Sequence, residues 1–120
     1  MIPWGPYGGV ERIPIEQQVM TRWIYQLVDP RNGEPFYVGH TNWPRRRLLT
    51  HISHGIHFVE SEYRTATYRK SKKIHEMLSE NVEPEIEILD VVFGTRSIAQ
   101  KLEYKWIQRI SKDYLLVNER

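Results

Sequence analysis

Residues 23–39 constrain the fold most, because two short strand-like segments flank a strong turn sequence. The first segment, WIYQLVD at 23–29, alternates in the manner of a β-strand, and PFYVG at 35–39 is typical of a second strand. Between them, PRNGEP at 30–35 combines proline with an Asn-Gly pair that tolerates positive φ. The sequence therefore predicts a β-hairpin over 23–39.

A helix is expected to begin near Pro44, because proline fits the first helical position, with Thr41 or Asn42 as its cap. Helical spacing assigns its buried side to Leu48, Leu49 and Ile52. It assigns a roughly opposite stripe to Arg47, His51 and His54. Three consecutive arginines lie at the start of this helix, where the helix dipole favours acids. We therefore expect the arginines to bind an anion.

The rest of the chain alternates between helical and strand-like segments. A loop over 55–66 precedes a basic amphipathic helix over 67–80. The inward residues of that helix are Ile74, Met77 and Leu78. A third, central strand is expected over 83–93 and a helix over 95–114. The apolar face of the last helix comprises Ile98, Ala99, Leu102, Trp106 and Ile110. These elements predict an α+β fold with a small three-stranded antiparallel sheet flanked by helices.

One domain is expected to follow a short arm. Residues 1–21 are rich in glycine and proline and predict an irregular arm with a short turn near 15–20, leaving 22–120 as a single domain. The chain has no cysteine, which excludes disulfides and thiolate metal sites. It also lacks a membrane-length apolar run and the residue order of a signal peptide. We therefore expect a cytoplasmic protein with no membrane partner.

The charge distribution is uneven although the net charge is only +2. The window from His40 to His75 holds eight of the 17 lysines and arginines, two of the 15 acids and all five histidines. A local patch of one sign is the footprint expected for a polyanion partner such as nucleic acid. The alternative is a solvated, basic helix surface without a partner.

Two further features suggest a site. Glu103 lies at the edge of the apolar face of the last helix, where a carboxylate must be paired, bind a cation, point into a cleft or reach solvent. Tyr25 and Tyr37 lie on the two strands of the hairpin, and antiparallel pairing can bring them together on one face. Ordinary packing is the alternative for both tyrosines.

The order of these residues resembles the GIY-YIG endonuclease family. The chain has Trp23-Ile24-Tyr25, eleven intervening residues and then Tyr37-Val38-Gly39. Arg47, Glu103 and Asn118 follow in the order of the family pattern, so the resemblance covers about 23–118. Trp23 stands where the family has glycine. Catalysis can survive this change if the glycine serves only backbone geometry or close packing, and is impaired if the aromatic ring fills the cleft.

The resemblance implies a metal-dependent endonuclease that hydrolyses DNA phosphodiester bonds, with RNA as a substrate left open. Tyr37 is then the base toward water, aided by a pKa lowered by the arginine and histidine stripe, and Tyr25 orients the water. Arg47 clamps the scissile phosphate with His51 nearby. Glu103 holds one Mg²⁺ or Mn²⁺ ion, and Asn118 supports the site.

The remaining basic side chains are expected to track the nucleic-acid backbone. These nucleic-acid-binding residues are His40, Arg46, His54, Arg69, Lys70, Lys72 and Lys73. A homodimer is one source of specificity that the sequence leaves open. Two alternatives also stay open: a catalytically inactive nucleic-acid-binding module on the same scaffold, and a zinc cluster formed by His51, His54 and His57.

Overall fold

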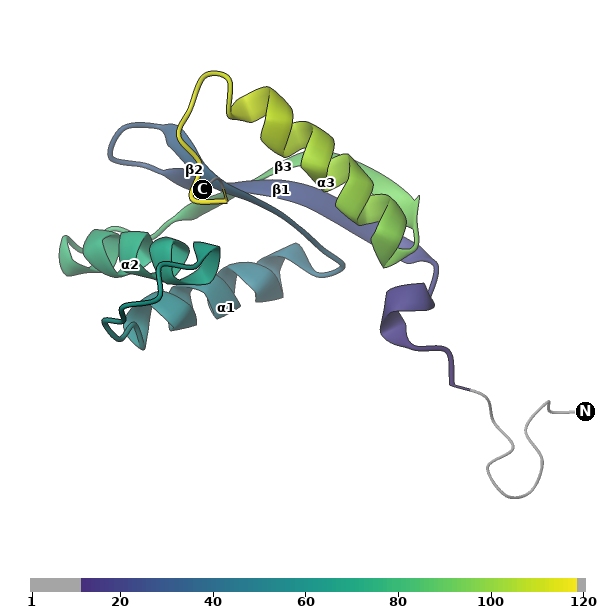
Figure 1. Cartoon of the computed structure of the whole chain (residues 1–120), viewed down its shortest axis with the longest axis horizontal. Coiled ribbons are helices and arrows are strands. Elements are labelled where there is room, and N and C mark those ends of the chain that lie inside the picture. The colour runs from purple at the N-terminus through teal and green to yellow at the C-terminus, as the bar shows by residue number, and fades with distance from the viewer. Residues whose placement is uncertain (1–11, 119–120) are drawn as a thin grey trace, which may run out of the picture.

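The computed structural model describes residues 12–118, which form an α+β fold (Figure 1). The elements in chain order are η1 (Ile15–Gln17), β1 (Met20–Asp29), β2 (Glu34–Thr41), α1 (Pro44–Ile56), α2 (Ala66–Ser79), β3 (Glu85–Gly94) and α3 (Arg96–Ile110). Within this range the strands form one antiparallel three-stranded sheet, so the predicted fold class is confirmed. Most of the predicted arm, 1–11, lies outside the described residues, and β1 begins before Trp23.

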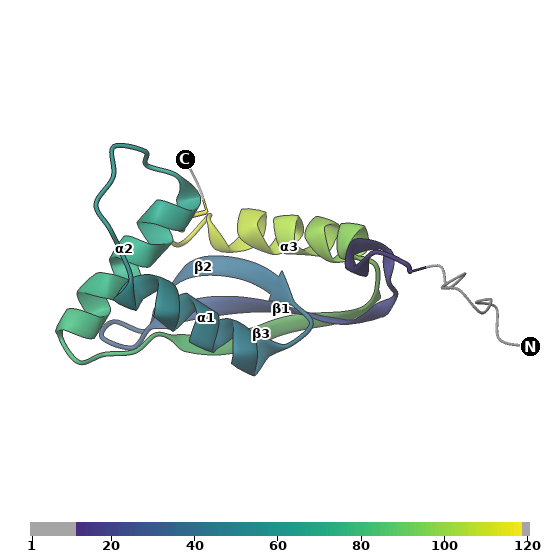
Figure 2. The same cartoon turned by 90° about the horizontal axis from the view of Figure 1, so that it is seen from below.

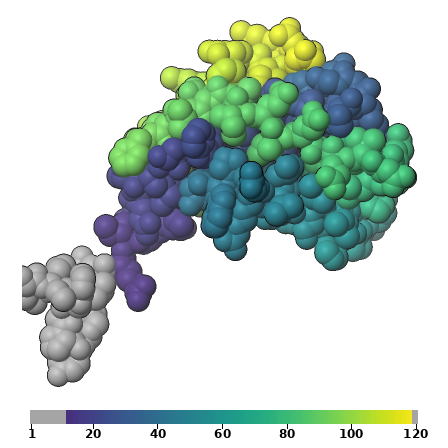
Figure 3. All heavy atoms as spheres, turned by 180° about the vertical axis from the view of Figure 1, so that it is seen from behind, coloured from purple at the N-terminus to yellow at the C-terminus, as the bar shows by residue number. Residues whose placement is uncertain are grey.

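The predicted hairpin is present, and β1 pairs antiparallel with β2. Its turn uses the expected chemistry, because Gly33 adopts a φ of +73°. The prediction of a central third strand is wrong, because the strand order is β2-β1-β3 and β3 is therefore at an edge. Its apolar sequence suggested burial on both faces, but Val91 and Phe93 are 49% and 72% exposed. Figure 3 shows this strand, in green, on the surface beside α1 in teal.

Helices cover both faces of the sheet, with α3 on one side and α1 with α2 on the other (Figures 1 and 2). The core on the α1 and α2 side consists of Tyr25, Leu27, Phe36, Ile74 and Met77. The core under α3 consists of Ile24, Val38 and Leu116, packed against partly buried residues of α3. Since β1 contributes to both cores, it is β1, rather than β3, that forms the central strand buried on both faces.

Helix α1 is rotated relative to its predicted orientation. Leu49 is 62% exposed, whereas His51 and Gly55 are buried. The face at His51 and Gly55 packs toward the sheet and α2, so the predicted stripe and buried side are partly exchanged. The predicted caps are also wrong, because Trp43 is the N-cap residue and, within the described range, no side chain caps this helix. The Thr41 hydroxyl instead accepts a hydrogen bond from the Trp43 N–H at 3.1 Å.

Gly55 lets α1 and α2 approach closely, which makes it a test of this packing. A Cβ at this position would lie 2.4 Å from Ile74 Cγ2 and 3.2 Å from the His75 backbone nitrogen. We expect Gly55→Ala to lower the free energy of unfolding by about 1–3 kcal/mol through overpacking, despite the better helix propensity of alanine. Urea denaturation measures this change. Exposed Ser53→Ala is the control, and an unchanged midpoint for Gly55→Ala would contradict the close approach.

Candidate active site

A cavity of about 420 Å³ lies where β2, α1 and α3 meet the segment before β1. Its lining joins residues that are far apart in the chain: Tyr37 and His40 from β2, Arg47 from α1, and Glu103 from α3. The segment before β1 closes another side through Ile15 and Glu16. Of the two tyrosines, the arginine and the glutamate expected to converge, Tyr37, Arg47 and Glu103 thus line one concave surface, whereas Tyr25 is fully buried and does not line it.

The hairpin register brings the two predicted tyrosines together. Tyr25 pairs with Gly39 and Tyr37 with Leu27, so the tyrosines are diagonal neighbours with ring centroids 6.3 Å apart. A Cβ at Gly39 would lie 2.6 Å from the Tyr25 hydroxyl oxygen and 3.0 Å from the Tyr37 ring. The glycine therefore gives the Tyr25 hydroxyl the space it occupies beside β2.

Tyr25 and His51 form a buried pair. Both residues are 0% exposed, and the Tyr25 hydroxyl oxygen lies 2.6 Å from His51 Nε2. Burial, followed by the charges of Lys70 and Arg47, lowers the pKa of His51 to about 2. His51 is therefore neutral at ordinary pH, and its ring nitrogen can accept the Tyr25 hydroxyl proton in a hydrogen bond.

Arg47 is half-buried, and its guanidinium interacts with the hydroxyl groups of both tyrosines. Burial is nevertheless the largest influence on both phenols, and it raises the pKa of Tyr25 and of Tyr37 above the ordinary value of 10.0. For Tyr37 the charge of Glu103 acts in the same direction, and Arg47 opposes it. Arg47 lowers the pKa of Tyr37 as expected, but burial outweighs Arg47 and His51 is neutral, so the net shift of the Tyr37 pKa is upward rather than downward.

Glu103 and Asn118 are held by specific partners. A Glu103 carboxylate oxygen lies 2.8 Å from Nδ1 of His40, and the Glu103 side chain keeps 24% of its surface exposed. Asn118 accepts a hydrogen bond from the Val38 N–H at 2.9 Å and donates one to the Val38 carbonyl at 2.8 Å. Asn118 thus joins the end of the chain to β2, next to Tyr37.

The GIY-YIG catalytic domain model matches residues 21–114. The chain belongs to the GIY-YIG family. No curated protein and no solved structure matches it significantly. Membership in the family implies nuclease activity in the broad sense, with nucleic acid as substrate, and GIY-YIG nucleases generally use divalent metals. None of the helices within 12–118 has the length and apolar character needed to cross a membrane.

Two carboxylates, Glu103 and Glu16, line the cavity of this GIY-YIG domain, and carboxylate oxygens are the ligands that hard divalent cations prefer. Across residues 12–118, no three His, Cys, Asp or Glu side chains gather closely enough to hold a metal ion together. The zinc alternative therefore fails, since His51 bonds to Tyr25 and His57 to the Ser53 carbonyl. Mg²⁺ retains several waters and is commonly held by one carboxylate and substrate phosphates, which fits Glu103 at an open cavity.

Lys70 is not part of an exposed basic patch, so the prediction that it tracks the nucleic-acid backbone is wrong. It is 3% exposed, with Nζ 3.2 Å from His54 Nδ1 and 5.5 Å from the Tyr37 ring centroid. Burial and the charge of Arg47 lower the pKa of Lys70 to about 8. Packing of α2 against α1 therefore places this lysine behind the cavity. His54, its partner, is exposed.

The other predicted contacts have different surroundings. Lys73 lies 3.2 Å from an Asp29 oxygen, and Arg69 donates a hydrogen bond to the Val117 carbonyl at 2.8 Å. Lys72 lies 5.9 Å from the Tyr68 ring centroid. Arg46 is exposed on α1, with Cζ 5.2 Å from the Trp43 ring centroid. Of these four, only Arg46 lies beside the residues that line the candidate active site.

Sequence reasoning missed several residues that line the cavity, and three of them are polar or charged residues of β1 and α3. Arg22 is 5% exposed and donates hydrogen bonds to the carbonyls of Gly94, Ile15 and Gln18, each at 3.0 Å. The other two residues are Arg96 and Gln100 of α3. Together with Glu103 they recur at i, i+4 and i+7, so helical spacing from Glu103 could have found them.

Proposed function

We propose that this GIY-YIG domain is an endonuclease that hydrolyses DNA phosphodiester bonds in the cavity between β2, α1 and α3. The observation that carries the proposal is the convergence of Tyr37, Arg47 and Glu103 on one surface. Binding alone does not require a carboxylate in a cavity meant for a polyanion, whereas a cation-assisted reaction does. Trp23, which replaces the motif glycine, does not line this cavity, so it leaves space for substrate.

Arg47 is the phosphate clamp in this proposal. Its guanidinium lines the cavity, is fixed by the two tyrosine hydroxyls, and has a buried Nε without a hydrogen-bond partner among the described residues. A planar guanidinium can bind two phosphate oxygens at once. Positive charge held in position stabilises the charge that develops on the phosphate during hydrolysis.

In this proposal Tyr37 first loses its hydroxyl proton to solvent, and the resulting phenolate accepts a proton from the attacking water, so the site must overcome the raised pKa of the Tyr37 hydroxyl. The charge of Glu103 is the second largest cause of that rise after burial. Glu103 would hold the divalent ion, which when bound supplies positive charge to the phosphate and leaving oxygens. Neutralising Glu103 removes one obstacle to forming the Tyr37 phenolate, so the carboxylate and the base act together.

Tyr25 and His51 position the reacting groups in this proposal. The hydrogen bond to neutral His51 fixes the Tyr25 hydroxyl, which also interacts with Arg47. Tyr25 thereby holds the guanidinium toward the cavity, and Asn118 keeps the backbone next to Tyr37 in place. His51 acts through Tyr25, since its buried ring lies beneath the cavity lining.

Incubation with supercoiled plasmid and Mg²⁺ or Mn²⁺ tests the proposed activity. We expect nicking or linearisation that a chelator abolishes, because the Glu103 carboxylate alone provides no positive charge. Glu103→Ala should reduce cleavage at least about 100-fold while DNA binding persists. Glu76→Ala, an exposed glutamate on α2, is the control and should cleave as wild type. Retarded plasmid without cleavage under any divalent metal would support the inactive binding module instead.

A further inference from the structure

A second cavity of about 360 Å³ adjoins the candidate active site. The two cavities share Ile15, Thr41, Asn42 and Arg47 in their linings. The second cavity extends along the first turns of α1 to Trp43, Arg46 and Thr50. The two cavities therefore adjoin each other with Arg47 lining both, and we call them together the strand groove.

One end of the strand groove is a polar face of α3. Arg96 and Gln100 precede Glu103 on this face and line the first cavity. Arg96 is half-exposed, and its nearest carboxylate oxygen, on Glu16, is 4.0 Å away. An exposed pair at that distance contributes little free energy, so Arg96 can exchange Glu16 for a phosphate.

The other end carries an exposed aromatic residue in an unusual position. Trp43 is the N-cap residue of α1, where Ser, Thr, Asp or Asn would stabilise the helix by about 1 kcal/mol. Its side chain is 58% exposed, with the Arg46 guanidinium carbon 5.2 Å from the ring centroid. An exposed indole beside a guanidinium suits a nucleobase and its phosphate.

Charge along the strand groove is predominantly positive. Helices α1 and α3 both begin at this end of the molecule, and neither has an acid in its first turn (Figure 2). Each has arginine there, which opposes the dipole preference and concentrates positive charge. The buried Arg22 fixes the segment over 15–18 as the groove wall by donating to two of its carbonyls.

We propose that the strand groove binds one nucleic-acid strand and contacts it on both sides of the phosphate held by Arg47. Arg96 contacts the phosphate on one side. On the other side Trp43 stacks on a nucleobase while Arg46 contacts its phosphate. This strand-groove proposal rests on the proposed function in one respect, because it takes the phosphate bound by Arg47 to be the scissile phosphate.

Equilibrium binding of short, fluorescently labelled single-stranded DNA, without divalent metal, tests the stacking. Trp43→Ala should weaken binding about 10-fold, and Trp43→Phe should restore most of the affinity, because the ring of phenylalanine can also stack on a nucleobase. A series of oligonucleotides with one abasic site each locates the stacked base. At that position, the loss of affinity caused by the abasic site and the loss caused by Trp43→Ala should not be additive.

The salt dependence of single-stranded DNA binding tests the phosphate contact of Arg96 at the other end of the strand groove. Arg96→Gln should reduce the slope of log affinity against log salt by about 0.7, the value for one phosphate contact on a single strand. Lys101→Gln removes the same charge from an exposed position of α3 that lines neither cavity, and should leave the slope unchanged.

Three results would overturn the strand groove: no binding of single-stranded DNA by the wild type, wild-type affinity for Trp43→Ala, or the same slope for Arg96→Gln and Lys101→Gln. Additive losses at every abasic position would also exclude stacking on Trp43. Since these measurements need no metal and no cleavage, they are independent of the plasmid assay. A protein that binds in this way but never cuts plasmid would defeat the proposed function alone.

Discussion

Arg47→Ala is expected to lower the rate of DNA cleavage by about 100- to 1,000-fold, the usual loss when a prepositioned group that stabilises transition-state charge is removed. Arg47 lines the candidate active site and interacts with both tyrosine hydroxyls. Its loss removes the phosphate clamp and also the main interaction that opposes the raised pKa of Tyr37. Single-turnover cleavage of a labelled duplex with Mg²⁺ measures the change.

Arg45→Ala is the matched control, because this exposed arginine precedes Arg47 by two residues and lines neither cavity of the strand groove. It should keep the cleavage rate near that of wild type. Arg47→Lys keeps the charge but cannot present a planar fork, so it should recover only part of the rate. Equal losses in Arg45→Ala and Arg47→Ala would show that general positive charge, rather than a clamp, is responsible.

Local sequence signals predicted the hairpin well. The Asn-Gly turn is a short-range signal, and Gly33 does adopt positive φ. The start of α1 followed from Pro44 for the same reason, since a proline at the first helical position acts within one turn. A third strand can join this hairpin at the free edge of β1 or at the free edge of β2, and no local signal specifies which. Either choice leaves β3 at an edge of the sheet, so the apolar run in β3 was misleading as a sign of a central strand.

The convergence of Tyr37, Arg47 and Glu103 could be predicted because their order in the chain matches a known family pattern. The burial and charge of the residues around them could not be predicted from the sequence. His51 is buried because α1 turns it toward Tyr25, and Lys70 is buried because α2 packs behind Tyr37. Both follow from helix packing around Gly55, which spacing along one helix does not reveal. His51 is therefore neutral, and it does not supply the positive charge that was expected from the stripe of Arg47, His51 and His54.

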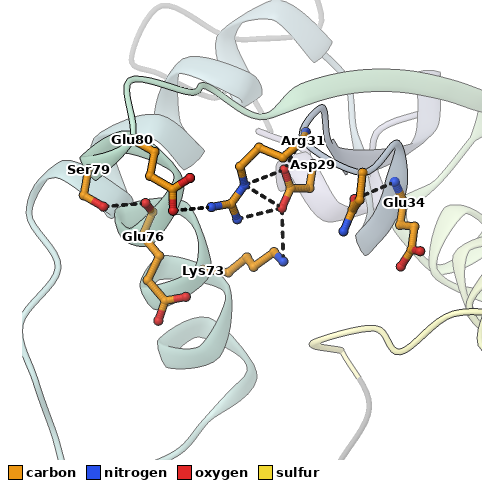
Figure 4. Close-up of polar contacts among 8 residues, drawn as sticks. Asp29, Arg31, Glu34, Lys73, Glu76, Ser79 and Glu80 are labelled. Carbon is orange, nitrogen blue, oxygen red and sulfur yellow. Dashed lines mark hydrogen bonds and ion pairs between the residues drawn. The ribbon is translucent and has the colours of Figure 1, made fainter.

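A buried ionic network joins the hairpin to α2 and gives the largest expected stability effect (Figure 4). The Asp29 side chain is 2% exposed and accepts hydrogen bonds from the Arg31 side chain at 2.7–3.2 Å and from the Arg31 N–H at 2.9 Å. Lys73 Nζ lies 3.2 Å from the same carboxylate. Arg31 also reaches the exposed Glu80 at 2.9 Å. Asp29 is thus the centre of the network, and Glu80 is at its edge.

Asp29→Ala should lower the free energy of unfolding by about 3 kcal/mol, the lower end for breaking a buried ion pair, because Arg31 and Lys73 keep about 30% exposure and can return to water. Urea denaturation at neutral pH measures this loss. Glu80→Ala breaks only an exposed pair and should cost less than about 1 kcal/mol. Similar losses in the two variants would show that the buried carboxylate has no special role.

The same carboxylate predicts how stability depends on pH. Hydrogen bonds from the Arg31 side chain are the largest cause of a pKa of Asp29 well below its ordinary value of 3.8. The folded protein therefore keeps Asp29 charged at a pH where the unfolded chain binds a proton. The contribution of Asp29 is complete above the unfolded pKa and declines as pH falls below about 4 toward the folded pKa. The stability difference between wild type and Asp29→Ala should be constant from neutral pH to about pH 5 and should shrink below about pH 4. A difference that stays constant down to pH 3 in urea titrations would show that Asp29 stabilises the fold without its charge.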